Sequence, residues 1–272
     1  MVACSSQQAA TSATPSLQPA QELAVLPDTC PTPDAFATAP DGSLTLSCPN
    51  FADNKKAGML LSISKGGQVT EIGAIPLDKG KARPMGLAWG EDGELYVANN
   101  GGRNRGSLLK LTISNQRILQ VEVIASGMST PNGLRYHQGH LYLTQLRLPK
   151  AGTAKMSSGL YRFDKNARNI TVKSDLTSPH LIFSTQTQNP SRQFGLDGLV
   201  FDSKGRLYVG DFGDAIIYRL TLNADGSVKK KTVFATLPNT VGIDGLAIDD
   251  NDVIYAAGFL QNQIWKISPQ GK

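Results

Sequence analysis

A pattern of 15 or 16 residues returns five times along this 272-residue chain, and it constrains the fold more than any other feature. Each copy reads as an apolar strand, a tight turn rich in Asp and Gly, and a second strand with alternating apolar residues. The copies occupy residues 33–48, 84–99, 131–145, 196–211 and 243–258. Their starts are 51, 47, 65 and 47 residues apart. Repetition at this spacing is typical of a β-propeller.

Further strands complete each unit. A third apolar strand follows every copy, and a fourth follows the first four, so the units predict four-stranded blades. The fifth unit ends without a fourth strand. Residues 22–27 (ELAVLP) have the missing strand's character, and we expect them to pair beside 262–268 and close the ring. The surplus of about 18 residues in the third unit is too short for another blade, so the sequence predicts five blades.

The composition agrees with a single all-β domain. Apolar residues make up 40% of the chain, and helical periodicity is almost absent. We therefore expect one propeller domain over residues 21–272, preceded at 1–20 by a flexible tether rich in Ser, Ala, Gln, Thr and Pro. The net charge of +5 is spread out and lacks aromatic interleaving, which argues against nucleic acid as a partner.

The three cysteines indicate where the protein resides. Val-Ala-Cys-Ser-Ser around Cys4 resembles the end of a bacterial lipoprotein signal, although the charged and apolar regions of a signal peptide do not precede it. We expect Cys4 to be lipid-modified and the protein to be anchored in the bacterial cell envelope or periplasm. The alternative is that Cys4 is an ordinary residue of the tether. Cys30 and Cys48 form an even pair, which predicts a disulfide in an exported protein.

The second residue of each copy is the candidate functional residue. These residues are Asp34, Met85, Asn132, Asp197 and Asp244. In a ring of blades, one repeat position points at one axis, so four oxygen-bearing side chains converge there. Such a set suits calcium or another divalent cation, and three carboxylates would repel one another without a cation between them. The alternative is that each Asp or Asn caps a local turn. Met85 is a poor ligand and is expected to pack in the channel.

Basic residues gather in the loops that share a rim with the axial residues. Arg103, Arg147 and Arg192 are candidate substrate-binding residues at an electropositive mouth, and the alternative is ordinary solvated loop charge. The three histidines show no metal-ligand or catalytic-triad spacing. Glycine-rich phosphate-binding motifs are absent, so nucleotide binding has no support.

The repeated P-N-G-L and L-D-G-L segments, followed by D-x-x-G-x-L-Y-V, resemble the senescence marker protein/gluconolactonase/luciferin-regenerating-enzyme family of β-propellers. The resemblance spans about residues 27–270. It implies a propeller, typically six-bladed, that holds one divalent cation, usually calcium. Carried over by position, Asp34 stands where the family has Glu, and Met85 stands where it has an Asn. Asn132 and Asp197 match a ligand Asn and the Asp that also serves as general base, whereas Asp244 is an additional carboxylate.

The expected function is therefore a calcium-dependent hydrolase of lactones or related esters. Asp197 is expected to act as the base, with Asp244 as competitor for that role. Two other functions remain open: a non-enzymatic envelope-tethered binding propeller with a structural calcium ion, and a protein-interaction scaffold resembling NHL-repeat propellers. We expect a monomer that takes a small-molecule substrate and meets the membrane only through a lipid anchor.

Overall fold

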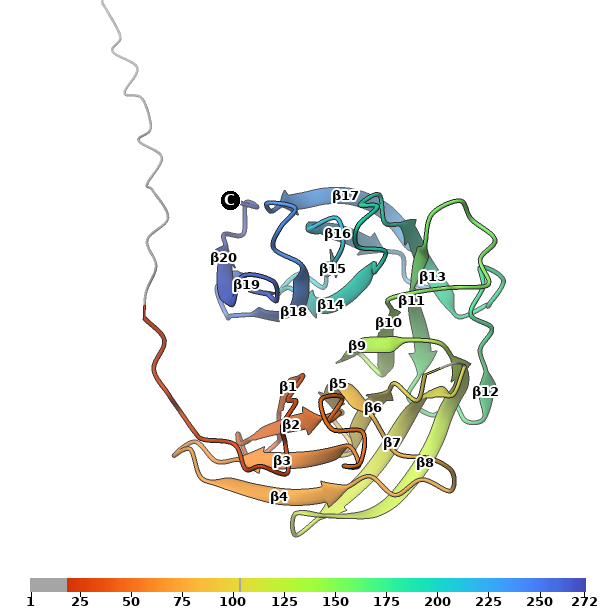
Figure 1. Cartoon of the computed structure of the whole chain (residues 1–272). Helices are drawn as coiled ribbons and strands as arrows, with labels where there is room; N and C mark the ends of the chain where they lie inside the picture. Colours follow the sequence, from red (N-terminus) through yellow and green to blue (C-terminus); the bar gives the residue numbers. More distant parts are fainter. Residues whose placement is uncertain (1–18, 103) are drawn as a thin grey trace, which may run out of the picture.

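The computed structural model describes residues 19–102 and 104–272, which form an all-β propeller without helices (Figure 1). Cys4 and the first 18 residues lie outside the described residues. Within these residues 20 strands form five sheets, each a blade with its lowest-numbered strand nearest the axis. All of these strand pairs are antiparallel except one short parallel pair, in which Ile170 and Thr171 lie beside Ala125 and Ser126. The prediction of five blades is therefore confirmed.

The blades follow one another along the chain. Blade 1 contains β1 (Phe36–Thr38), β2 (Leu44–Cys48), β3 (Met59–Ile63) and β4 (Val69–Ala74). Blade 2 contains β5 (Pro84–Trp89), β6 (Leu95–Asn99), β7 (Gly106–Ser114), β8 (Arg117–Met128) and the added β12 (Ile170–Thr171). Blade 3 contains β9 (Pro131–His137), β10 (His140–Gln145), β11 (Ser157–Asp164) and β13 (Leu181–Gln186). Blade 4 contains β14 (Leu196–Phe201), β15 (Leu207–Asp211), β16 (Ile216–Leu222) and β17 (Val228–Thr236). Blade 5 contains β18 (Ile243–Ile248), β19 (Ile254–Gly258) and β20 (Gln263–Ile267).

The predicted closing strand is wrong. Residues 22–27 form no strand, and blade 5 keeps only three strands within the described residues. Ala24 and Leu26 instead pack against the apolar core of blade 1. The physical reason lies a few residues further on, where Cys30 is bonded to Cys48 at the end of β2. This bond holds the segment beside blade 1, where its apolar side chains are covered without crossing to blade 5.

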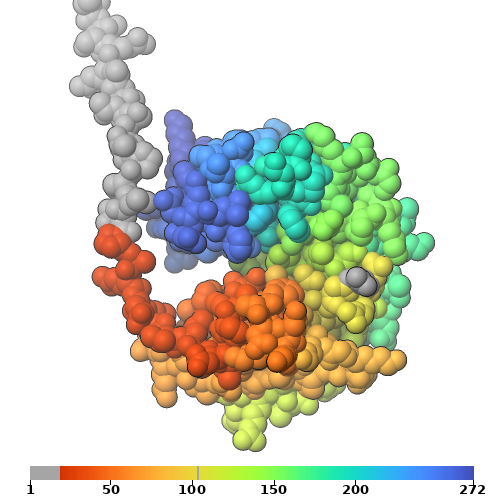
Figure 2. All heavy atoms as spheres, viewed as in Figure 1, coloured from red at the N-terminus to blue at the C-terminus, as the bar shows by residue number. Residues whose placement is uncertain are grey.

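Glycines next to the axial residues show where the ring is closed and where it is open. A β-carbon at Gly86, Gly133 or Gly198 would lie 2.3–2.5 Å from a backbone carbonyl oxygen of the following blade, so only glycine permits this close approach. At the equivalent Gly245, nothing lies within 4 Å. Among residues 19–102 and 104–272, blade 5 therefore has no neighbour on that side, and an open cleft separates it from blade 1 (Figure 2).

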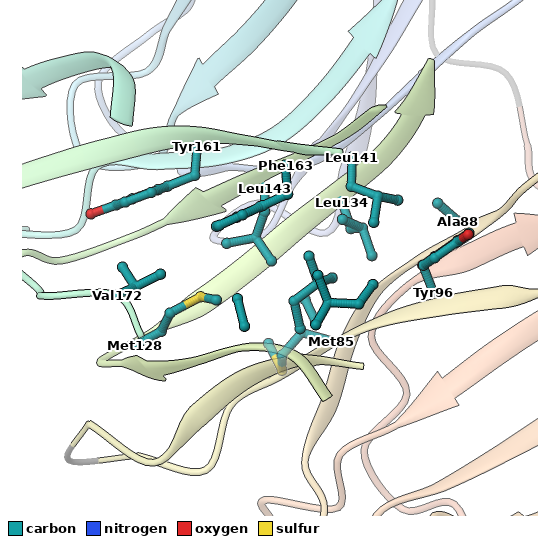
Figure 3. Packing of buried hydrophobic residues seen from close by; sticks show 14 of the residues in the cluster. Met85, Ala88, Tyr96, Met128, Leu134, Leu141, Leu143, Tyr161, Phe163 and Val172 are labelled. Atoms are coloured by element: carbon teal, nitrogen blue, oxygen red, sulfur yellow. The ribbon is translucent and has the colours of Figure 1, made fainter. Parts of the chain in front are cut away.

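Apolar side chains fill the spaces between the other blades. One cluster joins blades 2 and 3 and includes Met85, Tyr96, Leu134 and Phe163 (Figure 3). Met85 is 7% exposed and lies in this core, apart from the oxygen-bearing axial side chains. The expectation that Met85 packs in the channel is therefore wrong: its thioether packs between blades 2 and 3, where apolar side chains surround it.

The disulfide between Cys30 and Cys48 is confirmed, with their Cα atoms 5.4 Å apart. Both residues are buried in the core of blade 1. The bond spans 18 residues of chain, and a loop of this size stabilises a fold by about 3 kcal/mol. We expect the double substitution Cys30→Ser and Cys48→Ser to lower the free energy of unfolding by about that amount, measured in urea. A loss below about 0.5 kcal/mol would show that apolar packing alone holds the segment.

No helix capable of crossing a membrane occurs in the described part of the chain.

Candidate active site

The axial side chains are presented by irregular strand pairing. Asn132, Asp197 and Asp244 are the second residues of β9, β14 and β18. The register between β14 and β15 shifts between Leu196 and Leu199, and β18 shifts against β19 between Ile243 and Leu246. Such bulges locally release a strand from its partner and re-aim its side chains. The D-G-L sequence therefore places a carboxylate at the inner end of blades 4 and 5, and N-G-L places the Asn132 amide there in blade 3.

These residues line one pocket at the axis. The pocket has a volume of about 320 Å³ and is bounded by Asp34, Asn132, Asp197 and Asp244, with apolar walls provided by blades 1 and 5. It adjoins the open cleft, because both Phe36 of blade 1 and Ile264 of blade 5 contribute to its lining. The structure thus brings together the four oxygen-bearing residues that the sequence singled out.

Asp197 and Asp244 form a contacting pair. Burial, followed by the charges of Asp244 and Asp34, raises the pKa of Asp197 well above the ordinary range of an aspartate. Burial also raises the pKa of Asp244, while its hydrogen bond with Asp197 lowers it. The closeness of the two carboxyl groups disfavours the ionisation of both in the metal-free pocket.

Asp34 completes the acidic cluster from blade 1. Asp34 is an exposed residue at the mouth of the pocket. Desolvation by the pocket, followed by the charge of Asp244, raises the pKa of Asp34 to about 7. The effect of Asp244 means that the two carboxyl groups influence each other across the mouth of the pocket.

The donor set has the chemistry of a hard-cation site. Two contacting carboxyl groups and the Asn132 amide offer oxygen atoms, which are the ligands that calcium prefers. Within residues 19–102 and 104–272, no three acidic, histidine or cysteine side chains lie close enough together to hold a metal ion. An ion would therefore rest on the Asp197–Asp244 pair and Asn132, with Asp34 further away.

Two of the three arginines predicted to bind substrate, Arg147 and Arg192, lie apart from this pocket. Arg147 and Arg192 belong to rim loops and do not contribute to the pocket lining. The Arg147 guanidinium lies over the ring of Phe194, with Cζ 5.4 Å from the ring centroid. Arg103 lies outside the described residues. The role of these arginines in substrate binding stays a prediction.

Arg135 is a pocket residue that the sequence analysis missed. Its guanidinium donates hydrogen bonds to the carbonyl oxygens of Leu134 (2.8 Å) and Leu246 (2.6 Å), so it links blade 3 to blade 5. Burial lowers the pKa of Arg135 to about 10, which leaves it charged at neutral pH. The sequence did contain a signal for Arg135. The equivalent position in other copies holds the uncharged residues Ala88, Val200 and Ala247, so a charged side chain stands out there.

Thr144 fixes the strands that carry Asn132 and Asp197. Its fully buried hydroxyl donates to the carbonyl oxygen of Asp197 (2.7 Å) and accepts from the Gly133 N–H (2.8 Å). Thr144→Val keeps the shape and removes both bonds. We expect it to lower the free energy of unfolding by about 1–3 kcal/mol in urea denaturation, because two backbone groups lose their partner. The control Thr112→Val removes a partly buried bond to Glu94 and should cost less than about 1 kcal/mol; equal losses would contradict the assigned role.

The comparisons with known proteins agree with this architecture. The family profile described as SMP-30/Gluconolactonase/LRE-like region matches residues 75–272. The chain therefore belongs to the SMP-30/gluconolactonase/LRE-like family, as its repeated motifs indicated. No curated protein sequence is significantly similar to it.

Solved structures show the same fold at low sequence identity. A gluconolactonase from Xanthomonas campestris aligns with a TM-score of 0.57 and 17% identity, over 88% of this chain and 73% of that one. Virginiamycin B lyase from Staphylococcus aureus aligns with a TM-score of 0.55 and 17% identity, over 88% and 68%. PQQ-bound aldose sugar dehydrogenase from Streptomyces coelicolor aligns with a TM-score of 0.56 and 15% identity, over 92% and 80%. These three enzymes differ in activity, so the likeness defines the fold and leaves the reaction to be argued from the site.

Proposed function

We propose that the protein is a divalent-cation-dependent hydrolase of lactones or related esters, with calcium as the expected ion. The observation that carries this proposal is the contacting pair Asp197–Asp244 beside the Asn132 amide in an axial pocket. Membership of the SMP-30/gluconolactonase/LRE-like family supports a lactonase-like activity. The Xanthomonas campestris structure, a gluconolactonase, is consistent with it.

The four axial residues have different roles in this proposal. Asn132, Asp197 and Asp244 would hold the ion, with Asp34 facing its open side. A bound calcium ion would polarise the ester carbonyl and stabilise the negative charge that develops on its oxygen. The protein's own part is to place a water molecule between the substrate and a carboxylate.

Asp197 is the residue best suited to activate that water. Its burial raises its pKa, and a base of higher pKa accepts a proton more readily once it is ionised. Asp197 takes a proton from water as the water oxygen bonds to the carbonyl carbon. The same proton then passes to the departing alkoxide oxygen as the ester C–O bond breaks. The products are a carboxylic acid and an alcohol, which remain one molecule when the substrate is a lactone.

A second function is a binding propeller in which the ion only stabilises the fold. The observation favouring this function is the open side of the ring. No other blade packs against Gly245 in the described residues, so a ligand can bind to the exposed side of blade 5. The two functions differ in turnover: a binding propeller takes up its ligand and releases it unchanged.

A hydrolysis screen separates these functions. The purified protein is incubated with a panel of small lactones and aryl esters, with calcium and after treatment with a chelator, and acid release is followed by pH indicator. We expect hydrolysis of at least one lactone that is lost with the chelator and restored by calcium. Absence of hydrolysis across the panel in calcium would favour the binding propeller.

A further inference from the structure

The axial pocket continues into the open cleft, and the cleft walls are apolar. Phe36 on blade 1 is 51% exposed, and Ile264 on blade 5 is 67% exposed. Both line the same pocket as Asp197 and Asp244. Figure 2 shows this hollow between the first blade, in orange, and the last blade, in blue. An apolar surface thus leads directly from solvent to the carboxyl pair.

The polar groups available to a ligand lie almost entirely at the floor. The Tyr255 hydroxyl donates to Asp249 at 3.1 Å, and the Arg135 guanidinium is engaged by two carbonyl oxygens. Ala35, Ala247 and Ala257 on the facing walls offer no side-chain hydrogen bonds. A substrate rich in hydroxyl groups would leave them without partners along these walls, at a cost of about 1–3 kcal/mol for each buried group.

The size of the cleft suits one small molecule. A pocket of about 320 Å³ is at the lower end of the range for small-molecule sites. A stable protein partner would instead need roughly 800 Å² of surface on this side. Two exposed side chains, Phe36 and Ile264, supply far less than that, because a fully buried aromatic side chain covers only about 150–250 Å².

We propose that the cleft between blades 5 and 1 binds the alkyl or aryl arm of the substrate while its carbonyl lies at the Asp197–Asp244 pair. This inference rests on the proposed hydrolase function and names its substrate class: lactones or esters with an apolar arm, in preference to polyhydroxylated sugar lactones. Phe36 and Ile264 determine this specificity by covering the arm from opposite sides of the cleft.

The test compares two lactones that share the reacting ring. γ-Butyrolactone has no arm, γ-nonanolactone adds a pentyl chain, and glucono-δ-lactone serves as the hydroxylated comparison. We expect wild-type kcat/KM to be at least about tenfold higher for γ-nonanolactone than for the other two, since burial of two methylene groups suffices for a tenfold effect. A preference for glucono-δ-lactone, or equal values for both γ-lactones, overturns the proposal.

Two variants test where the apolar arm of the substrate binds. Phe36→Ala and Ile264→Ala should each raise KM for γ-nonanolactone about fivefold, a larger effect than either has on KM for γ-butyrolactone, which has no arm to cover. The matched controls are Phe51→Ala and Leu119→Ala, which remove side chains that are 44% and 66% exposed and do not line the pocket. Equal effects of a cleft variant and its control on γ-nonanolactone overturn the proposal.

A binding measurement keeps this inference separate from the catalytic one. The pentyl-substituted γ-lactam, which resists hydrolysis, is titrated into wild type and variants by calorimetry. If no lactone is hydrolysed but the lactam binds wild type and binds Phe36→Ala at least about fivefold more weakly, the cleft assignment stands and the hydrolase function fails. If lactones are hydrolysed while lactam affinity is the same in wild type and both cleft variants, the cleft assignment fails alone.

Discussion

Asp197→Asn is expected to reduce lactone hydrolysis by about 10²–10⁴-fold, the contribution typical of a positioned general base. The substitution keeps an oxygen atom for a cation and nearly the same volume, so the 3% exposed site should remain filled. It removes the group that accepts the proton from water. Turnover of the best substrate from the panel, at saturating calcium, measures the loss. Calcium-dependent stabilisation, measured by thermal unfolding, should be largely retained.

The matched variant is Asp244→Asn, which alters the other member of the pair. Burial raises the pKa of Asp244, while its hydrogen bond with Asp197 lowers it. We therefore expect this variant to weaken calcium binding more than it slows turnover at saturating calcium. If Asp197→Asn hydrolyses its substrates at the wild-type rate, Asp197 is not the base. If Asp244→Asn alone abolishes turnover at saturating calcium, the two roles are exchanged.

Local features of the sequence were sufficient to predict the blades, the disulfide and the axial carboxylates. Each blade begins with its own strand–turn–strand signal. The pairing of strands within a blade is therefore local and can be predicted without knowledge of distant contacts. Asp34, Asn132, Asp197 and Asp244 line one pocket because equivalent repeat positions lie at equivalent places around an axis. Cys30 and Cys48 could be paired because Cys4 falls in a segment of quite different composition.

The ring closure could not be predicted because it depends on a choice between two distant surfaces. Residues 22–27 are apolar enough to pack in either place, and Ala24 and Leu26 are covered by blade 1. The open cleft follows from that choice, and so does the open space beside Gly245. In the sequence, Gly245 has the same neighbours as Gly198, whose β-carbon would collide with blade 5. Arg135 was overlooked because its importance comes from a bond across the channel to Leu246.

Calcium at 100 times its dissociation constant is expected to raise the free energy of unfolding by about 2.7 kcal/mol, since an ion held by the proposed site would bind only the folded protein. In the metal-free protein, the acidic cluster destabilises the fold. Burial raises the pKa values of Asp197 and Asp244, so ionisation of these two groups opposes folding. Thermal unfolding with calcium and with chelator measures the gain, and magnesium at the same concentration serves as the comparison ion.

The pH dependence of the stability of the metal-free protein is a second test of the same acidic cluster. An aspartate in the unfolded chain titrates near pH 3.8, whereas the pKa of folded Asp34 is raised to about 7. Between these values the folded protein binds more protons than the unfolded chain, so its stability must fall as pH rises. We expect a lower melting temperature at pH 8 than at pH 5 in chelator, with the decrease reduced in Asp197→Asn.

Calcium should reverse that dependence, because the ion replaces the protons that the cluster otherwise retains. Its stabilising effect should therefore be larger at pH 8, where competing protons are scarce, than at pH 5. The exposed substitution Asp41→Asn, at a hairpin turn on the opposite face, should leave the calcium effect unchanged at both pH values. A calcium shift that is equal at the two pH values, or that survives in the double variant Asp197→Asn and Asp244→Asn, would place the ion away from these carboxylates.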